Sequence, residues 1–153
     1  MNFKVIFLDI DGVLNVYCED RDEYGCTFHQ HLVENLEMII RKTGAKIVIS
    51  STWRLSGLII MKEMWEKRNL PGEVIDITPF HEDRVRGNEI QEWINQYNPT
   101  NYVIIDDDSD ILSSQTDNFV RTSNNPDHID CVDVGYGLTK NCAEQAIKIL
   151  NKK

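Results

Sequence analysis

Three short runs of consecutive apolar residues stand out along the chain, and they are rich in β-branched side chains: Phe3 to Leu8, Lys46 to Ile49 and Tyr102 to Ile105. Each run has the length of a strand and lacks the polar alternation of a strand with one solvated face. Strands of this kind are buried on both faces, as in a parallel sheet. Two further short runs, Glu73 to Ile77 and Asn118 to Arg121, are candidate additional strands.

The segments between these runs have the spacing of amphipathic helices. Leu32, Leu36, Ile39 and Ile40 follow an i, i+4, i+7, i+8 pattern, and Gly44 lies where such a helix would end. Similar spacing predicts helices over 58–68, which the Pro71-Gly72 turn follows, over 88–97, and over 140–150 with Thr139 as N-cap. Because strands and helices alternate throughout, the sequence predicts an α/β fold, a Rossmann-like doubly wound parallel sheet in three α/β/α layers.

Length and composition favour one folded, soluble domain over 1–153. The chain has 153 residues without repeats or linkers, and 41% hydrophobic against 27% charged residues is ordinary globular usage. The N-terminal apolar run stops at Asp9, too early for a signal or membrane segment, so we expect a cytoplasmic protein with no membrane partner. A formal net charge of −9 disfavours long-range attraction to nucleic acid, so an anionic ligand needs local chemistry such as a metal ion.

The cysteines form no CxxC pair and no tight framework: Cys18, Cys26, Cys131 and Cys142. We therefore expect reduced thiols. His29 and His31 follow two of these cysteines, but their spacing matches no standard zinc site, which favours an ordinary loop.

Polar residues follow each of the three main strands. The first strand is followed by Asp9-Ile10-Asp11-Gly12, the second by Ser50-Ser51-Thr52, and the third by the acidic run from Asp106 to Asp110. The carboxyl ends of parallel strands meet at one edge, where ligands bind, so these groups should converge. Clustered carboxylates repel one another, and a hard divalent cation offsets this repulsion, so Mg²⁺ is the predicted cofactor. The last run alone could be a solvated turn, and neither acidic cluster has the spacing of an EF-hand calcium loop.

Four motifs, in this order, resemble those of the haloacid dehalogenase (HAD) superfamily of aspartate-nucleophile phosphatases. They are the DxDGxL pattern over 7–14, the apolar strand ending at Ser50, a basic residue at Arg86, and the acidic pair Asp106-Asp107 after a strand. The segments 50–54, 86–90, 106–108 and 137–139 further resemble the small HAD domains found alone or fused in bacterial and phage nucleic-acid-repair proteins.

The resemblance implies a role for each motif residue. Asp9 is the implied nucleophile, Asp11 the general acid and base, and Ser50 a phosphate ligand. Arg86 would offset charge on the phosphoryl oxygens, with Arg84 as its competitor for this role. The implied Mg²⁺ ligands are the carboxylates of Asp9 and Asp106 with the backbone carbonyl of Asp11. Asp107 and Asp110 would lie in or near the second shell, and the choice between Asp106 and Asp107 as ligand stays open.

Three residues after the second strand are candidate substrate contacts. Ser51 and Arg54 could bind the substrate, although Arg54 could equally be an exposed ion-pairing residue. Trp53 could stack on a substrate ring or belong to the core.

The resemblance also bears on the substrate, because HAD enzymes for small molecules usually carry a cap. The stretches 15–30 and 50–86 are too short for one, so we expect no substantial cap and an open site. The implied function is a Mg²⁺-dependent phosphomonoester hydrolase with an aspartyl-phosphate intermediate, acting on a nucleic-acid end, a nucleotide or a phosphoprotein. The alternative is a catalytically idle HAD-like module that binds a metal or a partner, which would not need the acid at Asp11. The oligomeric state stays open.

Overall fold

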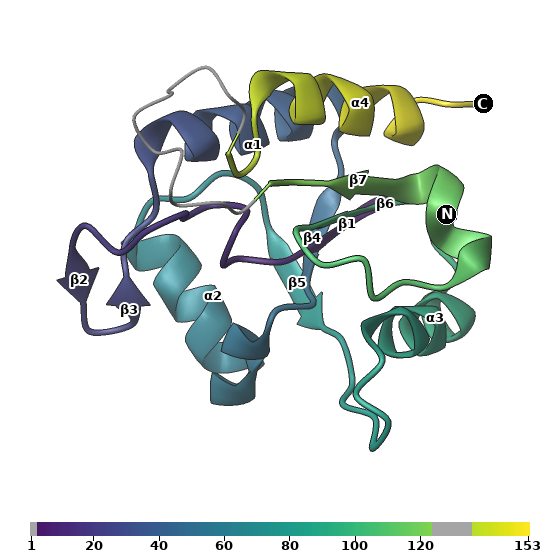
Figure 1. Ribbon diagram of the computed structural model, residues 1–153, viewed down its shortest axis with the longest axis horizontal. Helices are drawn as coiled ribbons and strands as arrows, with labels where there is room; N and C mark the ends of the chain where they lie inside the picture. Colours follow the sequence, from purple (N-terminus) through teal and green to yellow (C-terminus); the bar gives the residue numbers. More distant parts are fainter. Residues whose placement is uncertain (1–2, 124–135) are drawn as a thin grey trace.

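A five-stranded parallel sheet forms the centre of the computed structural model, which describes residues 3–123 and 136–153 (Figure 1). The strand order is β5-β4-β1-β6-β7, and every neighbouring pair is parallel. The strands are β1 (Lys4–Leu8), β4 (Lys46–Ile49), β5 (Val74–Ile77), β6 (Asn101–Asp106) and β7 (Phe119–Arg121). All five predicted strands are confirmed, and so is the α/β class with its doubly wound parallel sheet.

Helices connect these strands as the apolar spacing predicts: α1 (Gln30–Thr43), α2 (Leu58–Lys67), α3 (Arg86–Tyr97) and α4 (Lys140–Leu150). Gly44 ends α1, and the Thr139 hydroxyl caps α4 by accepting from the backbone N–H of Cys142 at 3.1 Å. Two short 3-10 segments, η1 (Thr52–Ser56) and η2 (Ser113–Asn118), were not predicted. None of the helices among the described residues combines the length and apolarity that a bilayer crossing requires.

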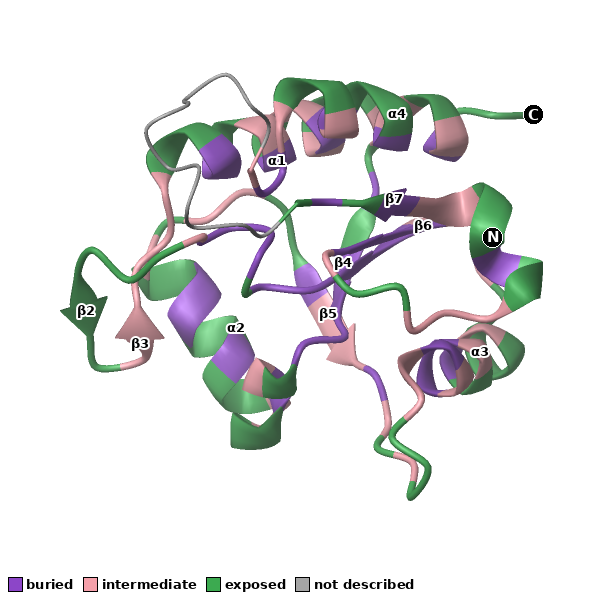
Figure 2. Ribbon diagram, in the orientation of Figure 1, coloured by how far each residue is buried: buried purple, intermediate pink, exposed green. Residues whose placement is uncertain are grey.

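Alternating side chains of each strand enter two different apolar layers. Ile6 and Leu8 of β1 belong to the layer that contains the buried faces of α1, α2 and α4, whereas Val5 and Phe7 pack with α3. The central strands β1, β4 and β6 are buried along most of their length, whereas the edge strands β5 and β7 each have one buried residue. Helices α1 and α4 lie side by side over the sheet (Figure 2). The sheet is thus covered on both faces, which confirms the three-layer expectation and explains why its strands read as continuous apolar runs.

The segment between β1 and α1 corrects the expectation of reduced cysteines. It forms a small antiparallel hairpin of β2 (Arg21–Asp22) and β3 (Gly25–Cys26). The hairpin turns the chain back on itself, so that the Cα atoms of Cys18 and Cys26 lie 5.3 Å apart and their sulfurs form a disulfide. These two thiols are therefore not zinc ligands, Cys142 is free, and Cys131 lies outside the described residues.

The hairpin is the largest structure that the described chain inserts before α1, and no helical cap covers the carboxyl edge of the sheet within the described residues. The expectation of a domain without a substantial cap is confirmed. Among the described residues, this edge is bordered by η1, by the loop over 78–85 and by the segment after β6.

Candidate active site

The sheet register places Asp9 between Ser50 and Asp106. The residue before Asp9 on β1 pairs with the residue before Ser50 on β4 and with the residue before Asp106 on β6. The backbone N–H of Asp9 donates to the Ile105 carbonyl and that of Ser50 to the Leu8 carbonyl, both at 3.0 Å. Since the chain builds outward from β1 in both directions, this edge is the topological switch point, where open α/β sheets bind ligands.

Three carboxylates converge at this point. Asp9, Asp106 and Asp107 each offer an oxygen, and these oxygens lie within 4.8 Å of one another. Burial and then the neighbouring Asp106 carboxylate raise the pKa of Asp9 to about 9, and burial also raises the pKa of Asp106. Both shifts show that the negative form is poorly compensated here. An oxygen-only donor set with excess negative charge fits a hard divalent cation such as Mg²⁺.

Gly12 is required for the position of Asp107. Its φ of +84° lies in the left-handed region, which an L side chain rarely adopts. A Cβ atom at Gly12 would also lie 2.2 Å from an oxygen of the Asp107 carboxylate. The glycine of the DxDG sequence therefore serves the acidic cluster directly, because it lets Asp107 approach the backbone after β1.

Arg86 is the cation beside the cluster. Its guanidinium bonds the Asp106 carboxylate and lies 3.5 Å from that of Asp9. Burial lowers the pKa of Arg86, but the Asp106 and Asp9 carboxylates outweigh this and raise it, so the guanidinium stays charged. Asp110 accepts a hydrogen bond from the Arg86 backbone N–H at 3.2 Å, which fixes the start of α3. The structure therefore brings Arg86 to the carboxylates, whereas Arg84 is exposed in the preceding loop.

Asp11 lies apart from the carboxylate cluster. Its side chain is exposed, and one of its oxygens accepts a hydrogen bond from the indole N–H of Trp53 at 3.1 Å. The Trp53 ring packs against Phe28, 5.6 Å between centroids. Stacking on a substrate ring and core packing are the two interpretations of Trp53 from sequence, and neither includes this hydrogen bond. Nothing in the local pattern links two residues that lie 42 positions apart.

The two serines after β4 have different surroundings. The hydroxyl of Ser50 is fully buried, and no described residue forms a hydrogen bond with it. A buried hydroxyl without a partner is costly, and a bound phosphoryl oxygen would satisfy it. The hydroxyl of Ser51 instead accepts from the backbone N–H of Trp53 at 3.2 Å and caps η1.

Arg54 is buried, so of its two interpretations from sequence the exposed ion-pairing residue is wrong. Only 2% of its side chain is accessible, and it pairs with Glu89 at 2.9 Å. Its five N–H groups are engaged by four backbone carbonyls and this carboxylate; the carbonyls belong to Ser50, Ser51, Thr78 and Pro79. No N–H of Arg54 remains for a substrate, and Glu89, Thr78 and Pro79 are partners that the sequence did not reveal.

Comparison with protein families agrees with this geometry. Residues 5–126 match the family model described as the HAD domain in Swiss Army Knife RNA repair proteins. The chain belongs to this family. The match spans more than half of the chain and includes Asp9, Asp11, Ser50, Arg86 and Asp106. The resemblance to small HAD domains of nucleic-acid-repair proteins is thereby confirmed.

Comparisons with curated proteins and with solved structures are less informative about this chain. No curated protein matches the chain. Among solved structures, this HAD domain is similar to a hydrolase of HAD superfamily subfamily III A from Legionella pneumophila, with 14% sequence identity and a TM-score of 0.49. That similarity covers 99% of this chain and 85% of the other.

Two basic residues of the HAD domain hold its hairpin. The guanidinium of Arg68 bonds the Asp22 carboxylate at 2.6 Å and the carbonyls of Gly25 and Cys26 at 3.2 Å. Lys67 pairs with Glu23 at 3.3 Å. These two cations attach the hairpin to α2.

Proposed function

We propose that this HAD domain is a Mg²⁺-dependent phosphomonoester hydrolase that forms an aspartyl-phosphate on Asp9. The observation that carries the proposal is the buried carboxylate cluster beside the unpartnered Ser50 hydroxyl, at the switch point of a sheet whose chain belongs to a HAD family. Such proximity is costly without a cation, because burial and then the neighbouring Asp106 carboxylate raise the pKa of Asp9 to about 9.

The reaction proceeds in two displacements at phosphorus. A carboxylate oxygen of Asp9 attacks, the bond from phosphorus to the leaving oxygen breaks, and Asp11 donates a proton to that oxygen. Asp11 then removes a proton from water, the water oxygen attacks phosphorus, and the bond to Asp9 breaks to release inorganic phosphate. Ser50 donates its hydroxyl proton to a phosphoryl oxygen, and Arg86 offsets negative charge on these oxygens.

Asp9, Asp106 and Asp107 would hold Mg²⁺ together with the backbone carbonyl of Asp11. When bound, the cation supplies positive charge that favours the ionised form of Asp9 and attracts the substrate phosphate. The proposal adds Asp107 as a direct ligand, because its carboxylate belongs to the same cluster. Asp110 is assigned to the start of α3 through its bond to the Arg86 N–H.

A phosphorylated nucleic-acid end is the substrate class that we favour. The family is named for domains in RNA repair proteins, and no cap among the described residues restricts the site to small molecules. A protein with a net charge of −9 can still bind one terminal phosphate through a metal ion, whereas binding along a duplex would require clustered lysine and arginine residues. That the whole chain forms one domain and that it acts in the cytoplasm stay predictions.

Hydrolysis of an aryl phosphate tests the proposal against the idle-module alternative. Wild type should release inorganic phosphate from p-nitrophenyl phosphate only with Mg²⁺, and Asp9→Asn should lower kcat at least ~10³-fold. Asp117→Asn, on the exposed face of η2, is the matched control and should keep the wild-type rate. Asp9→Asn should also fold, since it removes one of the buried like charges. Equal turnover in Asp9→Asn would refute the aspartyl-phosphate mechanism, and a wild type inactive on aryl and polynucleotide phosphates alike would favour the idle module.

A further inference from the structure

A groove of about 830 Å³ adjoins the carboxylate cluster, and the mechanism above leaves it unused. The residues that line it belong to η1, to the loop over 78–85, to the start of α3 and to the segment after β6. Arg86 lines it and also bonds the Asp106 carboxylate, so the groove begins at the position where the phosphate is proposed to bind. Its volume lies within the range of small-molecule sites, about 300–1,000 Å³.

Exposed apolar side chains line this groove. Phe80 is 50% exposed and Leu55 is 72% exposed, although both border a strongly polar active-site edge. The Phe80 ring lies 3.8 Å from the guanidinium carbon of Arg54, which the hydrogen bonds described above hold in place. Phe80 is therefore an aromatic ring on a rigid support with half of its surface accessible, which is what a stacking platform requires.

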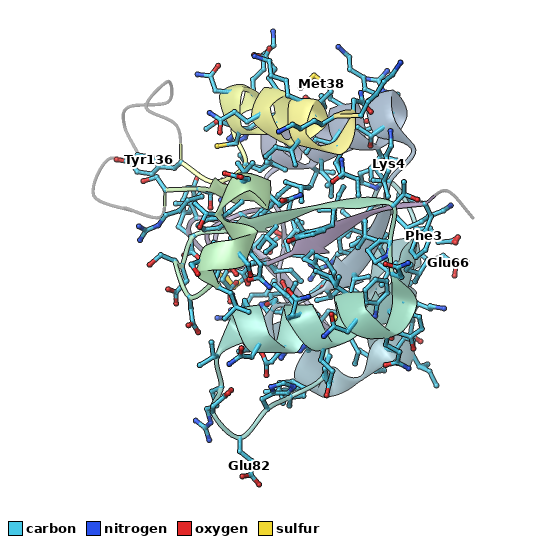
Figure 3. The ribbon with its side chains drawn as sticks, turned by 90° about the vertical axis from the view of Figure 1, so that its right-hand side faces the viewer. Phe3, Lys4, Met38, Glu66, Glu82 and Tyr136 are labelled. Carbon is cyan, nitrogen blue, oxygen red and sulfur yellow. A yellow bond between two sulfur atoms is a disulfide. The ribbon has the colours of Figure 1, made fainter. Side chains whose placement is uncertain are left out.

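Arg84 supplies a cation at the same groove. It is exposed and adopts a positive φ of 55° in a turn closed by its N–H to the His81 carbonyl. Figure 3 shows Glu82, in the same loop, at the far end of the molecule from α4, so the loop projects beyond the sheet. Two of the groove's acids are engaged: Glu89 pairs with Arg54, and Asp110 accepts from the Arg86 N–H. The groove therefore combines an aromatic ring on which a base can stack with an arginine that can contact a phosphodiester.

We propose that this groove binds the nucleoside that carries the scissile phosphate, with its base stacked on Phe80 and Arg84 in contact with the next phosphodiester of the polynucleotide. The inference rests on the proposed phosphatase and adds where the leaving group lies. A phosphopeptide fits less well, because the groove offers an aromatic platform with a single exposed cation, and none of the described residues that line it belongs to a strand to which an extended peptide could add.

Comparison of two substrates tests the groove. A trinucleotide phosphorylated at its 5′ or 3′ end places a nucleoside in the groove, whereas p-nitrophenyl phosphate lacks the nucleoside and the phosphodiester. The ratio of kcat/KM for the trinucleotide to that for p-nitrophenyl phosphate should fall about tenfold in Phe80→Ala, as loss of one stacked base predicts. It should also fall in Arg84→Ala, with a weaker salt dependence for the trinucleotide. Tyr97→Ala removes an exposed aromatic ring at the other end of α3 and should leave the ratio unchanged.

A binding measurement keeps the groove testable without turnover. The dephosphorylated trinucleotide, followed by NMR titration, should bind wild type more tightly than Phe80→Ala whether or not the protein is a phosphatase. Turnover of the trinucleotide with an unchanged ratio in Phe80→Ala would overturn the groove and leave the phosphatase standing. Nucleotide binding that depends on Phe80, without any turnover, would support the groove proposal and contradict the phosphatase proposal. A phosphopeptide hydrolysed faster than the trinucleotide would also overturn the groove proposal.

Discussion

Two buried pairings of arginine with carboxylate lie near the carboxyl edge of this sheet, and they differ in how completely their charges are balanced. Arg54 faces one carboxylate, that of Glu89, and its other N–H groups are engaged by backbone carbonyls. Arg86 lies beside the carboxylates of Asp9 and Asp106, with Asp107 in the same cluster. The charges of the Arg54 pair balance, whereas at the Arg86 site the ionised carboxylates would outnumber the one guanidinium.

This difference separates a structural role from a functional one. Arg54 ties the turn after β4 to the end of β5 and to α3, which places Ser50 and supports Phe80. At the Arg86 site, burial and then the Asp106 carboxylate raise the pKa of Asp9 to about 9, and Arg86 offsets only part of this rise. The unbalanced charges of the Arg86 site therefore indicate where a cation and a phosphate would bind. The balanced Arg54 site indicates a structural role in holding the active-site edge.

Removal of the Arg54 guanidinium is expected to give the largest effect on stability. Arg54→Met leaves the Glu89 carboxylate and four carbonyls without their donor, and breaking one side of a buried ion pair costs about 3–5 kcal/mol. Denaturant unfolding at pH 7 measures this loss. Arg41→Met, at an exposed position of α1, is the matched control and should change stability by less than about 0.5 kcal/mol.

The double variant Arg54→Met/Glu89→Met sharpens the result. Because it removes both charges, it should recover part of the stability that Arg54→Met loses. If Arg54→Met is as stable as wild type, the hydrogen bonds of Arg54 do not have the structural role described above.

The same arginine shows where prediction from sequence ends. Asp9, Ser50 and Asp106 could be predicted as neighbours, because each follows a buried run and parallel strands bring such positions together. Arg54 could not, since its partner Glu89 lies 35 residues away on a helix whose apolar spacing says nothing about buried acids. The disulfide was missed for a similar reason. Two-residue strands leave no periodic pattern, so the turn that brings Cys18 to Cys26 has no signal in the sequence.

Substitution of Gly12 tests the Arg86 site through its affinity for Mg²⁺. In Gly12→Ala the new methyl group would occupy the position of the Asp107 carboxylate, so this ligand must move. We expect Mg²⁺ affinity, measured by calorimetric titration, to fall at least about 10–100-fold, because displacing a direct ligand costs no less than displacing a group that supports one. Gly44→Ala is the matched control, because its φ of +71° imposes similar backbone strain with nothing within 4 Å.

The pH dependence of the same titration gives an independent check. Because the pKa of Asp9 is raised to about 9, this carboxyl retains its proton at neutral pH in the metal-free protein, and Mg²⁺ must displace it. Burial raises the pKa of Asp106 in the same direction. Affinity in wild type should therefore rise as the pH increases toward 9 and fall as it decreases. An affinity that does not vary between pH 6 and 9 would contradict the charge imbalance on which the comparison of the two sites rests.

Loss of the indole N–H of Trp53 is expected to give the smallest effect, because Trp53 acts through Asp11 and does not contact phosphate in the proposed mechanism. Trp53→Phe keeps an aromatic ring against Phe28 and removes the donor to the Asp11 carboxylate. Proton donation matters more for a poor leaving group, so kcat should fall about tenfold on an alkyl phosphate and less on p-nitrophenyl phosphate. Trp65→Phe also loses an indole hydrogen bond, to the Pro71 carbonyl, and should leave the ratio of the two rates unchanged. If Trp53→Phe lowers both rates equally, the indole supports the fold of this edge and does not orient the acid.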